Sequence, residues 1–225
     1  MTTYRCGCIN EVHKPSGILH SISKCRAHQR QARDPATWGR GHYASFGLLT
    51  DDDRLAETAH AAELIEALGP LPIALGNGEA LEIGCGVSPY VGAIRDAGWG
   101  YIGVDLSQWA ADWMWCNLFA YVVMTSWELC HGSSRYGLIL SAHALEHMQD
   151  APAALQKMAD ALLTGGQLWL VVPDDEDPIN PDHLWMFTPQ TLRSAVEAVG
   201  LTVERLETHR RVKHENFLYC RAVKP

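Results

Sequence analysis

The chain has 225 residues, and 47% of them are hydrophobic, so it is long and apolar enough to form one domain with a buried core and an appendage. No apolar run reaches the ~18 residues of a membrane-spanning helix, and the first residues lack the hydrophobic stretch of a secretory signal. Seven cysteines, an odd number, favour free thiols or a metal in a reducing compartment over a disulfide framework. We therefore expect a cytoplasmic protein without a membrane partner.

The net charge of −8 is unevenly distributed along the chain. Residues 1–50 contain seven basic side chains and only two acidic ones, so the remainder is strongly acidic. A basic arm on an acidic body could dock on an anionic partner such as a nucleic acid. A solvated surface is the favoured interpretation, because a run of charge alone is weak evidence for a partner.

After residue 51 the sequence alternates short apolar strands with amphipathic helices, which is typical of an α/β fold. We predict a Rossmann-like, seven-stranded, mostly parallel sheet flanked by helices. No helix separates the last two strands, so they are expected to form an antiparallel hairpin. The predicted strands are 79–84, 101–105, 120–125, 136–142, 167–172, 201–207 and 216–223, and the predicted helices are 52–69, 89–97, 108–118, 151–163 and 188–199.

The stretch EALEIGCGVSPY is an apolar strand that breaks into two glycines one residue apart. Gly84 and Gly86 permit a tight turn and close approach of the backbone to a ligand, but Pro89 stands where a dinucleotide-binding motif has its third glycine. Glu82 lies at the end of the same strand. Asp105 ends the next strand, nineteen residues beyond Gly86, where a carboxylate can accept hydrogen bonds from both hydroxyls of a ribose.

Imidazoles and a carboxylate follow the fourth predicted strand. That strand runs into SAHALEH, which contains His143, Glu146 and His147, and His183 comes later in a polar loop. Ligands of an α/β sheet bind beyond the carboxyl ends of the strands, so these side chains are candidate general bases. A packed or capping imidazole is the alternative for His143. The H-x-x-E-H pattern of a zinc protease also fits, but that motif requires a long helix and a further acidic ligand.

These motifs, in this order, resemble those of a class I S-adenosylmethionine-dependent methyltransferase with a small-molecule methyltransferase-like domain. The family's acid-x-Gly-x-Gly turn is matched at 82–86, and its strand ending in a ribose-binding acid is matched at 103–107. The LEH triplet after the family's fourth strand is matched at 145–147. Together with the L-x-x-GG turn at 162–166 and the FTP segment at 187–189, these matches span about residues 52–207.

The resemblance implies S-adenosylmethionine as the cofactor, held at the glycine turn and the next strand end. The third glycine is dispensable because no pyrophosphate is bound. The family usually has an acid after its third strand that bonds the adenine amine, and here the match is ambiguous: Ser126 or Glu128 could form this bond, and Trp127 could stack on the ring. The expected cofactor-binding residues are Glu82, Gly84, Gly86, Asp105, Leu106, Ser126, Trp127 and Glu128.

The resemblance also implies methyl transfer by in-line displacement, in which the placement of donor and acceptor supplies most of the acceleration. A general base matters only for a poor nucleophile such as a hydroxyl. Of the expected catalytic residues, His143 is placed best, His147 supports its loop, and His183 lies in a loop that could form a lid. Some O-methyltransferases that resemble this domain bind a divalent ion at this segment, which is a less favoured alternative.

The expected acceptor is a small or medium-sized molecule, with an oxygen favoured as the acceptor atom and an activated carbon as the alternative. Residues 141–144 lack the Asn-Pro-Pro-aromatic motif that many amino methyltransferases carry after the fourth strand. One alternative is a nucleic acid or protein acceptor, recruited by the basic residues 1–34. A third hypothesis is a regulator that binds the cofactor without catalysis.

The basic segment before the domain carries a cluster of metal-binding side chains. Cys6 and Cys8 are separated by sixteen residues from Cys25 and His28, and four such ligands could close a tetrahedral, structural zinc site. Zinc would allow a segment with few apolar residues to fold. Incidental cysteines in a loose arm are the alternative. The predicted organisation is a Cys/His-rich basic appendage at 1–34, a linker or cofactor cover at 35–51, and the methyltransferase-like domain at 52–225.

Overall fold

The computed structural model describes residues 20–21, 53–72, 74, 78–125, 127, 134–174, 183–210 and 216–225. These ranges include most of the predicted α/β domain and two residues of the predicted appendage, while the predicted cofactor cover at 35–51 lies outside the described residues. The domain boundaries therefore stay a prediction. Within the part of the chain that the structure describes, no helix is both long and apolar enough to cross a membrane.

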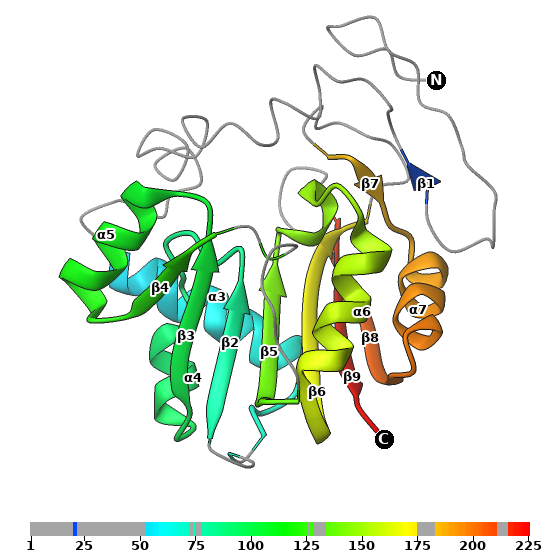
Figure 1. Cartoon of the computed structure of the whole chain (residues 1–225), viewed down its shortest axis with the longest axis horizontal. Coiled ribbons are helices and arrows are strands. Elements are labelled where there is room, and N and C mark those ends of the chain that lie inside the picture. The colour runs from blue at the N-terminus through cyan, green and yellow to red at the C-terminus, as the bar shows by residue number, and fades with distance from the viewer. Residues whose placement is uncertain are drawn as a thin grey trace, which may run out of the picture.

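A seven-stranded sheet forms the centre of the fold. Its strands are β2 (Glu79–Ile83), β3 (Gly100–Asp105), β4 (Tyr121–Met124), β5 (Tyr136–Ala142), β6 (Leu162–Pro173), β8 (Thr202–Arg210) and β9 (Asn216–Val223). The order across the sheet is β4-β3-β2-β5-β6-β9-β8 (Figure 1). Strand β9 runs antiparallel to both of its neighbours, and the other neighbouring pairs are parallel. The predicted Rossmann-like sheet with its antiparallel closing hairpin is confirmed.

Helices cover both faces of the sheet. They are α3 (Asp53–Leu68), α4 (Val91–Asp96), α5 (Gln108–Leu118), α6 (Ala151–Ala161) and α7 (Pro189–Ala198), with a 3-10 helix, η3 (Leu145–His147). Leu81 and Ile83 of β2 share a core with α6 and α7, whereas Ala80 shares a core with α3, α4 and Met114 of α5. Successive strand residues point to opposite faces, so a strand covered on both faces, such as β2, is mostly apolar, with the buried Glu82 as its exception.

Strand β6 begins earlier than predicted. The sequence favoured a helix through 163 and a strand from 167, whereas α6 ends at Ala161 and Leu162 already pairs with Tyr136 of β5. Two hydrogen bonds hold the glycine turn here against the end of β9: the Gly165 N–H donates to the Lys224 carbonyl (2.8 Å), and the Lys224 N–H donates to the Gly166 carbonyl (2.9 Å). Pairing between distant segments thus overrides the local helical pattern.

A second, two-stranded sheet was not predicted. Strand β1 (His20–Ser21) pairs antiparallel with β7 (Trp185–Met186). Strand β7 begins two residues after His183 and lies against η3. Part of the N-terminal segment is therefore placed beside the segment that carries the candidate catalytic histidines.

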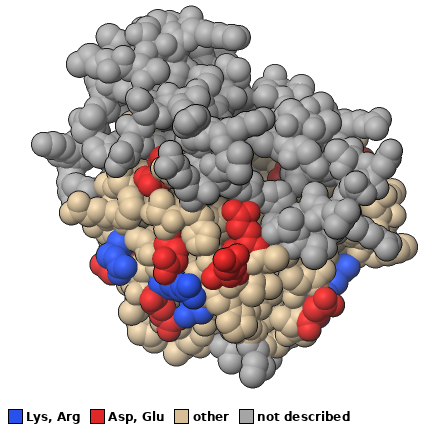
Figure 2. All heavy atoms as spheres, turned by 180° about the vertical axis from the view of Figure 1, so that it is seen from behind, with Lys and Arg blue, Asp and Glu red and all other residues tan. Residues whose placement is uncertain are grey.

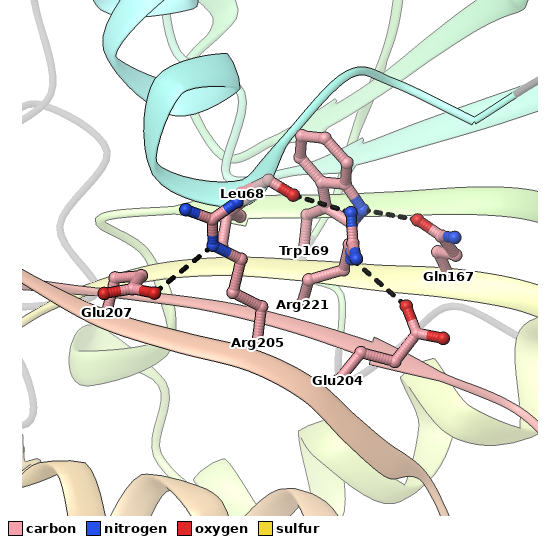
Figure 3. A network of polar contacts seen from close by, with 7 residues as sticks. All are labelled: Leu68, Gln167, Trp169, Glu204, Arg205, Glu207 and Arg221. Atoms are coloured by element: carbon pink, nitrogen blue, oxygen red, sulfur yellow. Dashed lines mark hydrogen bonds and ion pairs between the residues drawn. The ribbon is translucent and has the colours of Figure 1, made fainter.

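A polar network joins the end of α3 to the antiparallel side of the sheet (Figure 3). Nη1 of Arg221 on β9 donates to the Leu68 carbonyl (2.6 Å), one of the carbonyls that the end of α3 leaves without a partner in the helix. Nε of the same side chain lies 3.1 Å from Oε2 of Glu204 on β8. Beside it, the Trp169 indole N–H donates to Gln167 Oε1 (2.8 Å). One guanidinium thus ties a helix and two strands together.

Charged side chains of both signs alternate on the face of the molecule opposite to that seen in Figure 1 (Figure 2). Among the residues described on this face, Lys and Arg form small groups beside Asp and Glu, and no broad patch of one sign is visible. This mixed pattern is that of an ordinary solvated surface. It gives no support to a nucleic-acid interface on this face.

Arg221→Ala should lower the free energy of unfolding by about 1–3 kcal/mol, because the Leu68 carbonyl then loses a charged donor in a partly buried position. Urea denaturation measures the change. Arg193→Ala is the matched control, since its guanidinium pairs with Glu197 (3.3 Å) on the exposed surface of α7, where a loss below about 0.5 kcal/mol is expected. Equal losses in the two variants would contradict the role given to Arg221.

Candidate active site

The predicted glycine turn follows β2 at the carboxyl edge of the sheet. Gly84 and Gly86 have φ values of +67° and +49°, in the left-handed region that glycine adopts without strain. The N–H groups of Gly84 and Cys85 both donate to the Val104 carbonyl at the end of β3 (2.8 and 3.1 Å). A Cβ atom at Gly84 would overlap the Cβ atom of Ala144, which follows β5. The turn therefore requires glycine for its conformation and for its contact with the next strand end.

Asp105 ends β3 and holds the glycine turn in place. Its Oδ2 accepts a hydrogen bond from the Gly86 N–H (2.7 Å), and its Oδ1 accepts one from the Ser107 N–H (2.8 Å). Burial raises the pKa of Asp105, although the backbone N–H groups of Ser107, Gly86 and Leu106 act in the opposite direction. The structure thus brings the two predicted features, the glycine turn and the strand-end acid, into direct contact.

Glu82 lies beneath the turn and is almost fully buried, at 2% exposure. Its Oε2 accepts a hydrogen bond from the Tyr101 hydroxyl (2.7 Å). Burial raises the pKa of Glu82 to about 7, while the hydroxyls of Ser88 and Tyr101 lower it and the Asp105 carboxylate raises it. The sequence did not predict that Tyr101 and Ser88 lie beside Glu82. Tyr101 stands in an apolar strand and Ser88 in a turn, and neither pattern indicates a hydrogen bond to a buried carboxylate.

The candidate catalytic residues form one cluster around Glu146 on η3. His143 Nδ1 lies 3.8 Å from Glu146 Oε1, and His147 Nε2 lies 4.0 Å from the same oxygen. The rings of His147 and His183 meet edge to face with centroids 5.0 Å apart. His183 is itself buried, and the Leu184 N–H donates to the Glu146 carbonyl (2.8 Å). The segment after the predicted lid loop is therefore anchored on η3.

The backbone of His143 adopts an unusual conformation directly after β5. Its φ of +54° is left-handed, and its N–H donates to the Val171 carbonyl (2.8 Å). The ring packs edge-on against Phe217 (4.7 Å between centroids), and 40% of the side chain is exposed. The strand end thus presents a partly accessible imidazole beside a buried carboxylate.

Glu146 is a buried carboxylate among imidazoles. Its side chain is 1% exposed, and neither carboxylate oxygen has a hydrogen-bond partner among the described residues. Burial raises its pKa, but His143, His147 and His183 act in the opposite direction and together lower the pKa below its usual value. Glu146 is therefore held in its ionised form by the three side chains around it.

The remaining predicted residues fall into two groups. Trp127 is buried in the core on the α6 side, and its indole N–H donates to the Ala154 carbonyl (3.3 Å), so its stacking on adenine stays a prediction. Leu106 is half-buried and directly follows Asp105. The predicted residues that lie outside the described part of the chain are Ser126, Glu128, Cys6, Cys8, Cys25 and His28.

The glycine turn and the histidine cluster are neighbours at one edge of the sheet. The carboxyl ends of β2, β3 and β5 all point to the upper edge in Figure 1. Ala144, which crowds Gly84, lies between His143 and η3 in the sequence. The candidate ligand-binding turn and the cluster of imidazoles and a carboxylate therefore meet at the sheet edge where ligands of α/β sheets bind.

A family model described as a methyltransferase domain matches residues 53–206, more than half of the chain. The chain belongs to the methyltransferase domain family. It is a class I S-adenosylmethionine-dependent methyltransferase, as the order of its motifs predicted. None of the curated proteins matches the sequence.

Solved methyltransferases share the fold at low sequence identity. The 1,6-didemethyltoxoflavin-N1-methyltransferase of Burkholderia thailandensis, solved with 1,6-didemethyltoxoflavin and S-adenosylhomocysteine, is 17% identical with a TM-score of 0.66, over 92% of this chain and 94% of that one. The magnesium protoporphyrin IX methyltransferase of Synechocystis, solved with S-adenosylmethionine, is 14% identical with a TM-score of 0.63, over 91% and 100%. The N-methyltransferase NodS of Bradyrhizobium japonicum is 20% identical with a TM-score of 0.59, over 77% and 99%.

Replacing Glu82 by glutamine should remove a pH dependence from the stability of the cofactor-free methyltransferase. The folded protein holds this proton up to about pH 7, whereas a glutamate at its usual pKa of 4.5 in the unfolded chain has already lost it. Stability should therefore fall as the pH rises through this window, by about 3 kcal/mol in total. Glu82→Gln cannot ionise, and its amide oxygen can still accept the hydrogen bond from Tyr101, so it should not show this fall.

Urea denaturation at about pH 5 and about pH 8 measures the difference. Glu66→Gln, at an exposed position of α3, controls for the loss of one carboxylate from the chain. The same fall in stability in the wild type and in Glu82→Gln would show that burial of Glu82 is not its cause.

Proposed function

We propose that this methyltransferase transfers the methyl group of S-adenosylmethionine to a hydroxyl oxygen of a small or medium-sized molecule. The observation that carries the proposal is the contact between two elements at one sheet edge. The glycine turn, fixed by Asp105, adjoins a strand end where three imidazoles surround the Glu146 carboxylate. The first element suits the cofactor, and the second suits an acceptor that must lose a proton.

We assign the cofactor to the turn because groups that can hydrogen-bond to it remain available there. Each carboxylate oxygen of Asp105 accepts one backbone N–H and keeps a further lone pair, so the carboxylate can also accept the ribose hydroxyls. Gly84 and Gly86 allow the methionine and sugar end to approach the backbone. The related structures that hold S-adenosylmethionine or S-adenosylhomocysteine support this assignment. Ser126 or Glu128, with Trp127, remain the hypothesis for the adenine contact.

Transfer to an oxygen requires removal of one proton. The bond between sulfur and the methyl carbon breaks as the bond between oxygen and that carbon forms, and the electron pair of the broken bond remains on the sulfur. The proton of the acceptor hydroxyl passes to a base, and His143 is the most accessible imidazole of the cluster. Placement of donor and acceptor in line supplies most of the remaining acceleration.

The related structures include N-methyltransferases, so the fold alone does not select the acceptor atom. The choice of oxygen rests on the cluster itself, because a neutral amine needs no base before it is methylated. The choice of a small acceptor is supported by the small molecule bound in one related structure and by β1, which places part of the N-terminal segment beside β7. We interpret that segment as a cover over the acceptor.

The alternative is a nucleic acid or protein acceptor that residues 1–34 recruit. Its support is the basic composition of that segment, with or without zinc at Cys6, Cys8, Cys25 and His28. Binding of labelled RNA or DNA that falls steeply with added salt, and that is lost when the basic side chains of the segment are replaced, would favour this alternative. Zinc in the appendage and a cytoplasmic location stay predictions.

Asp105→Ala should weaken binding of S-adenosylhomocysteine by about 1–3 kcal/mol, because the ribose loses a charged acceptor and the turn loses its hydrogen bond to Gly86. Isothermal titration calorimetry measures the affinity. Asp96→Ala, at the exposed end of α4, is the matched control and should bind as the wild type does. If the folded Asp105→Ala variant binds with unchanged affinity, the cofactor lies elsewhere.

His143→Asn should lower turnover of hydroxyl acceptors by about 10²–10⁴-fold while leaving cofactor affinity unchanged. Asparagine is chosen because it tolerates the left-handed φ of +54° at this position. Release of S-adenosylhomocysteine is measured over a panel of small phenols, alcohols and amines. Amines that are neutral at the assay pH should lose much less activity than hydroxyl compounds. An equal loss for both classes would exclude His143 as the base.

A further inference from the structure

Large apolar side chains are exposed together at one edge of the sheet. Among the described strands, β4 pairs with β3 alone and is therefore an edge strand, and helix α5 packs against it (Figure 1). Trp115 and Phe119 at the end of α5, with Tyr121 and Met124 of β4, form what we call the β4 edge patch, and between 52% and 76% of each residue's surface is exposed. The described part of the chain has five exposed large hydrophobic residues, and Ile65 on α3 is the fifth.

Phe119 is held in an unusual backbone conformation within this patch. It follows Trp115 by about one helical turn, and its φ of +48° lies in the left-handed region, which is costly for a bulky residue. The Arg95 guanidinium donates hydrogen bonds to the carbonyls of Leu118 (2.7 Å) and Phe119 (3.0 Å) and so fixes this end of the helix. Since 76% of Phe119 is exposed, burial of its side chain within the chain does not offset that cost.

The two edges of the sheet differ in how they are protected. Strand β8, at the opposite edge, carries Glu204, Arg205 and Glu207, and charged side chains on an edge strand discourage pairing with another chain. The four residues of β4 are Tyr-Val-Val-Met, without a charge or a proline. Strand β4 therefore lacks the charged residues that protect the other edge.

The outer backbone of β4 also has no partner strand. The Thr125 N–H donates to the Asp105 carbonyl on β3 (2.9 Å). Because the backbone groups of successive strand residues point alternately to the two sides, those of Val122 and Met124 point away from β3, where no described strand lies. An uncovered edge of this kind is a surface to which another chain can bind.

The size of the patch is sufficient for a dimer interface. A large side chain buries about 150–250 Å² when it is covered, so the exposed parts of the four patch residues amount to on the order of 500 Å² per copy. Two copies in contact would bury about 1,000 Å² from these side chains alone, which reaches the lower limit of a specific interface. The neighbouring backbone of β4 would add to this area.

The chemistry of the patch suits a second copy of this chain. In a two-fold symmetric contact, the same patch of each copy meets the other, so a charged patch would place like charges together. The four patch residues are all uncharged and apolar or aromatic. The patch is therefore complementary to itself.

We propose that this methyltransferase forms a two-fold symmetric dimer in which the β4 edge patches of two copies cover each other. The dimer buries Trp115 and Phe119, which offsets the conformational cost at Phe119, and it covers the free edge of β4. Strands β3 and β2 lie between β4 and β5, so the histidine cluster after β5 takes no part in the interface. The dimer does not depend on the proposed acceptor.

Sedimentation velocity of the full chain over a range of protein concentrations tests for the dimer. A species of twice the chain mass of 24.9 kDa is expected. A reducing agent is present throughout, because Cys116 is exposed on α5 and a disulfide between two copies would mimic association. A wild type that stays monomeric up to its solubility limit would overturn the proposal.

Trp115→Lys with Phe119→Gly tests whether the patch forms the interface. Lysine is a good helix former and glycine adopts the φ of +48° without strain, so the chain should still fold. The dissociation constant of the dimer should rise by at least about 100-fold, since each aromatic occurs twice in the interface and truncation of a central aromatic costs about tenfold or more. The urea midpoint of the wild type should rise with protein concentration, and that of the double variant should not.

Ile65→Lys is the matched control, because it replaces the fifth exposed hydrophobic residue by the same charged one on a different helix. It should dimerise as the wild type does. If the double variant does not fold, Phe119→Gly alone should still raise the dissociation constant by at least about tenfold. Patch variants that dimerise as tightly as the wild type, or an equal loss in Ile65→Lys, would place the interface elsewhere and overturn the proposal.

Discussion

The Asp105 carboxylate, shared between the backbone N–H groups of Gly86 and Ser107, is the interaction on which the rest of the site depends. It joins the end of β3 to the turn that follows β2, and Asp105 itself is only partly buried. Charge-assisted hydrogen bonds of this kind are strong and directional. The turn is therefore positioned before any ligand arrives. The close contact of Gly84 with Ala144 also packs the turn against the residue that follows the end of β5.

A second carboxylate, that of Glu82, lies on the buried side of the turn. Glu82 accepts a hydrogen bond from the Tyr101 hydroxyl. It is also close enough to Asp105 for the negative charge of Asp105 to raise its pKa. Two acids at one turn thus have separate environments: one is hydrogen-bonded to the backbone at the edge of the sheet, and the other is enclosed in the core. At the end of β5, the Glu146 carboxylate has no hydrogen-bond donor among the described residues, and the imidazoles of His143, His147 and His183 surround it.

Most of the fold was predictable because its strands are short apolar runs separated by clear helix and turn signals. The N-caps of α5 and α7, Ser107 and Thr188, are local features that a sequence displays. The early start of β6 was not predictable, because it depends on partners that are distant in the sequence. Leu162 pairs with Tyr136 of β5, and Gly165 and Gly166 form backbone hydrogen bonds with Lys224. The placement of β9 between β6 and β8 likewise depends on pairing between segments far apart in the sequence.

The candidate site was predictable to the extent that its parts are local motifs at strand ends. Two adjoining strand ends carry Glu82, Gly84, Gly86 and Asp105. The spacing of these residues in the sequence was therefore enough to predict that they lie together. No local motif indicated that His183 lies close to Glu146. It lies there because β7 contacts η3 and because the Leu184 N–H donates to the Glu146 carbonyl. The environment of Glu82 was also hidden, since Tyr101 reads as one more apolar position of a buried strand.

The insertion of β9 into the sheet has a consequence for how the protein is made. Among the described strands, β8 pairs with β9 alone, although β9 is synthesised after it. Until residues 216–223 leave the ribosome, the edge of β6 has no partner on that side, and Trp169, Leu170 and Val171 lack the strand that will pair with them. Such an open, apolar edge invites pairing with other chains. The nascent protein is therefore more exposed to aggregation until β9 has joined the sheet.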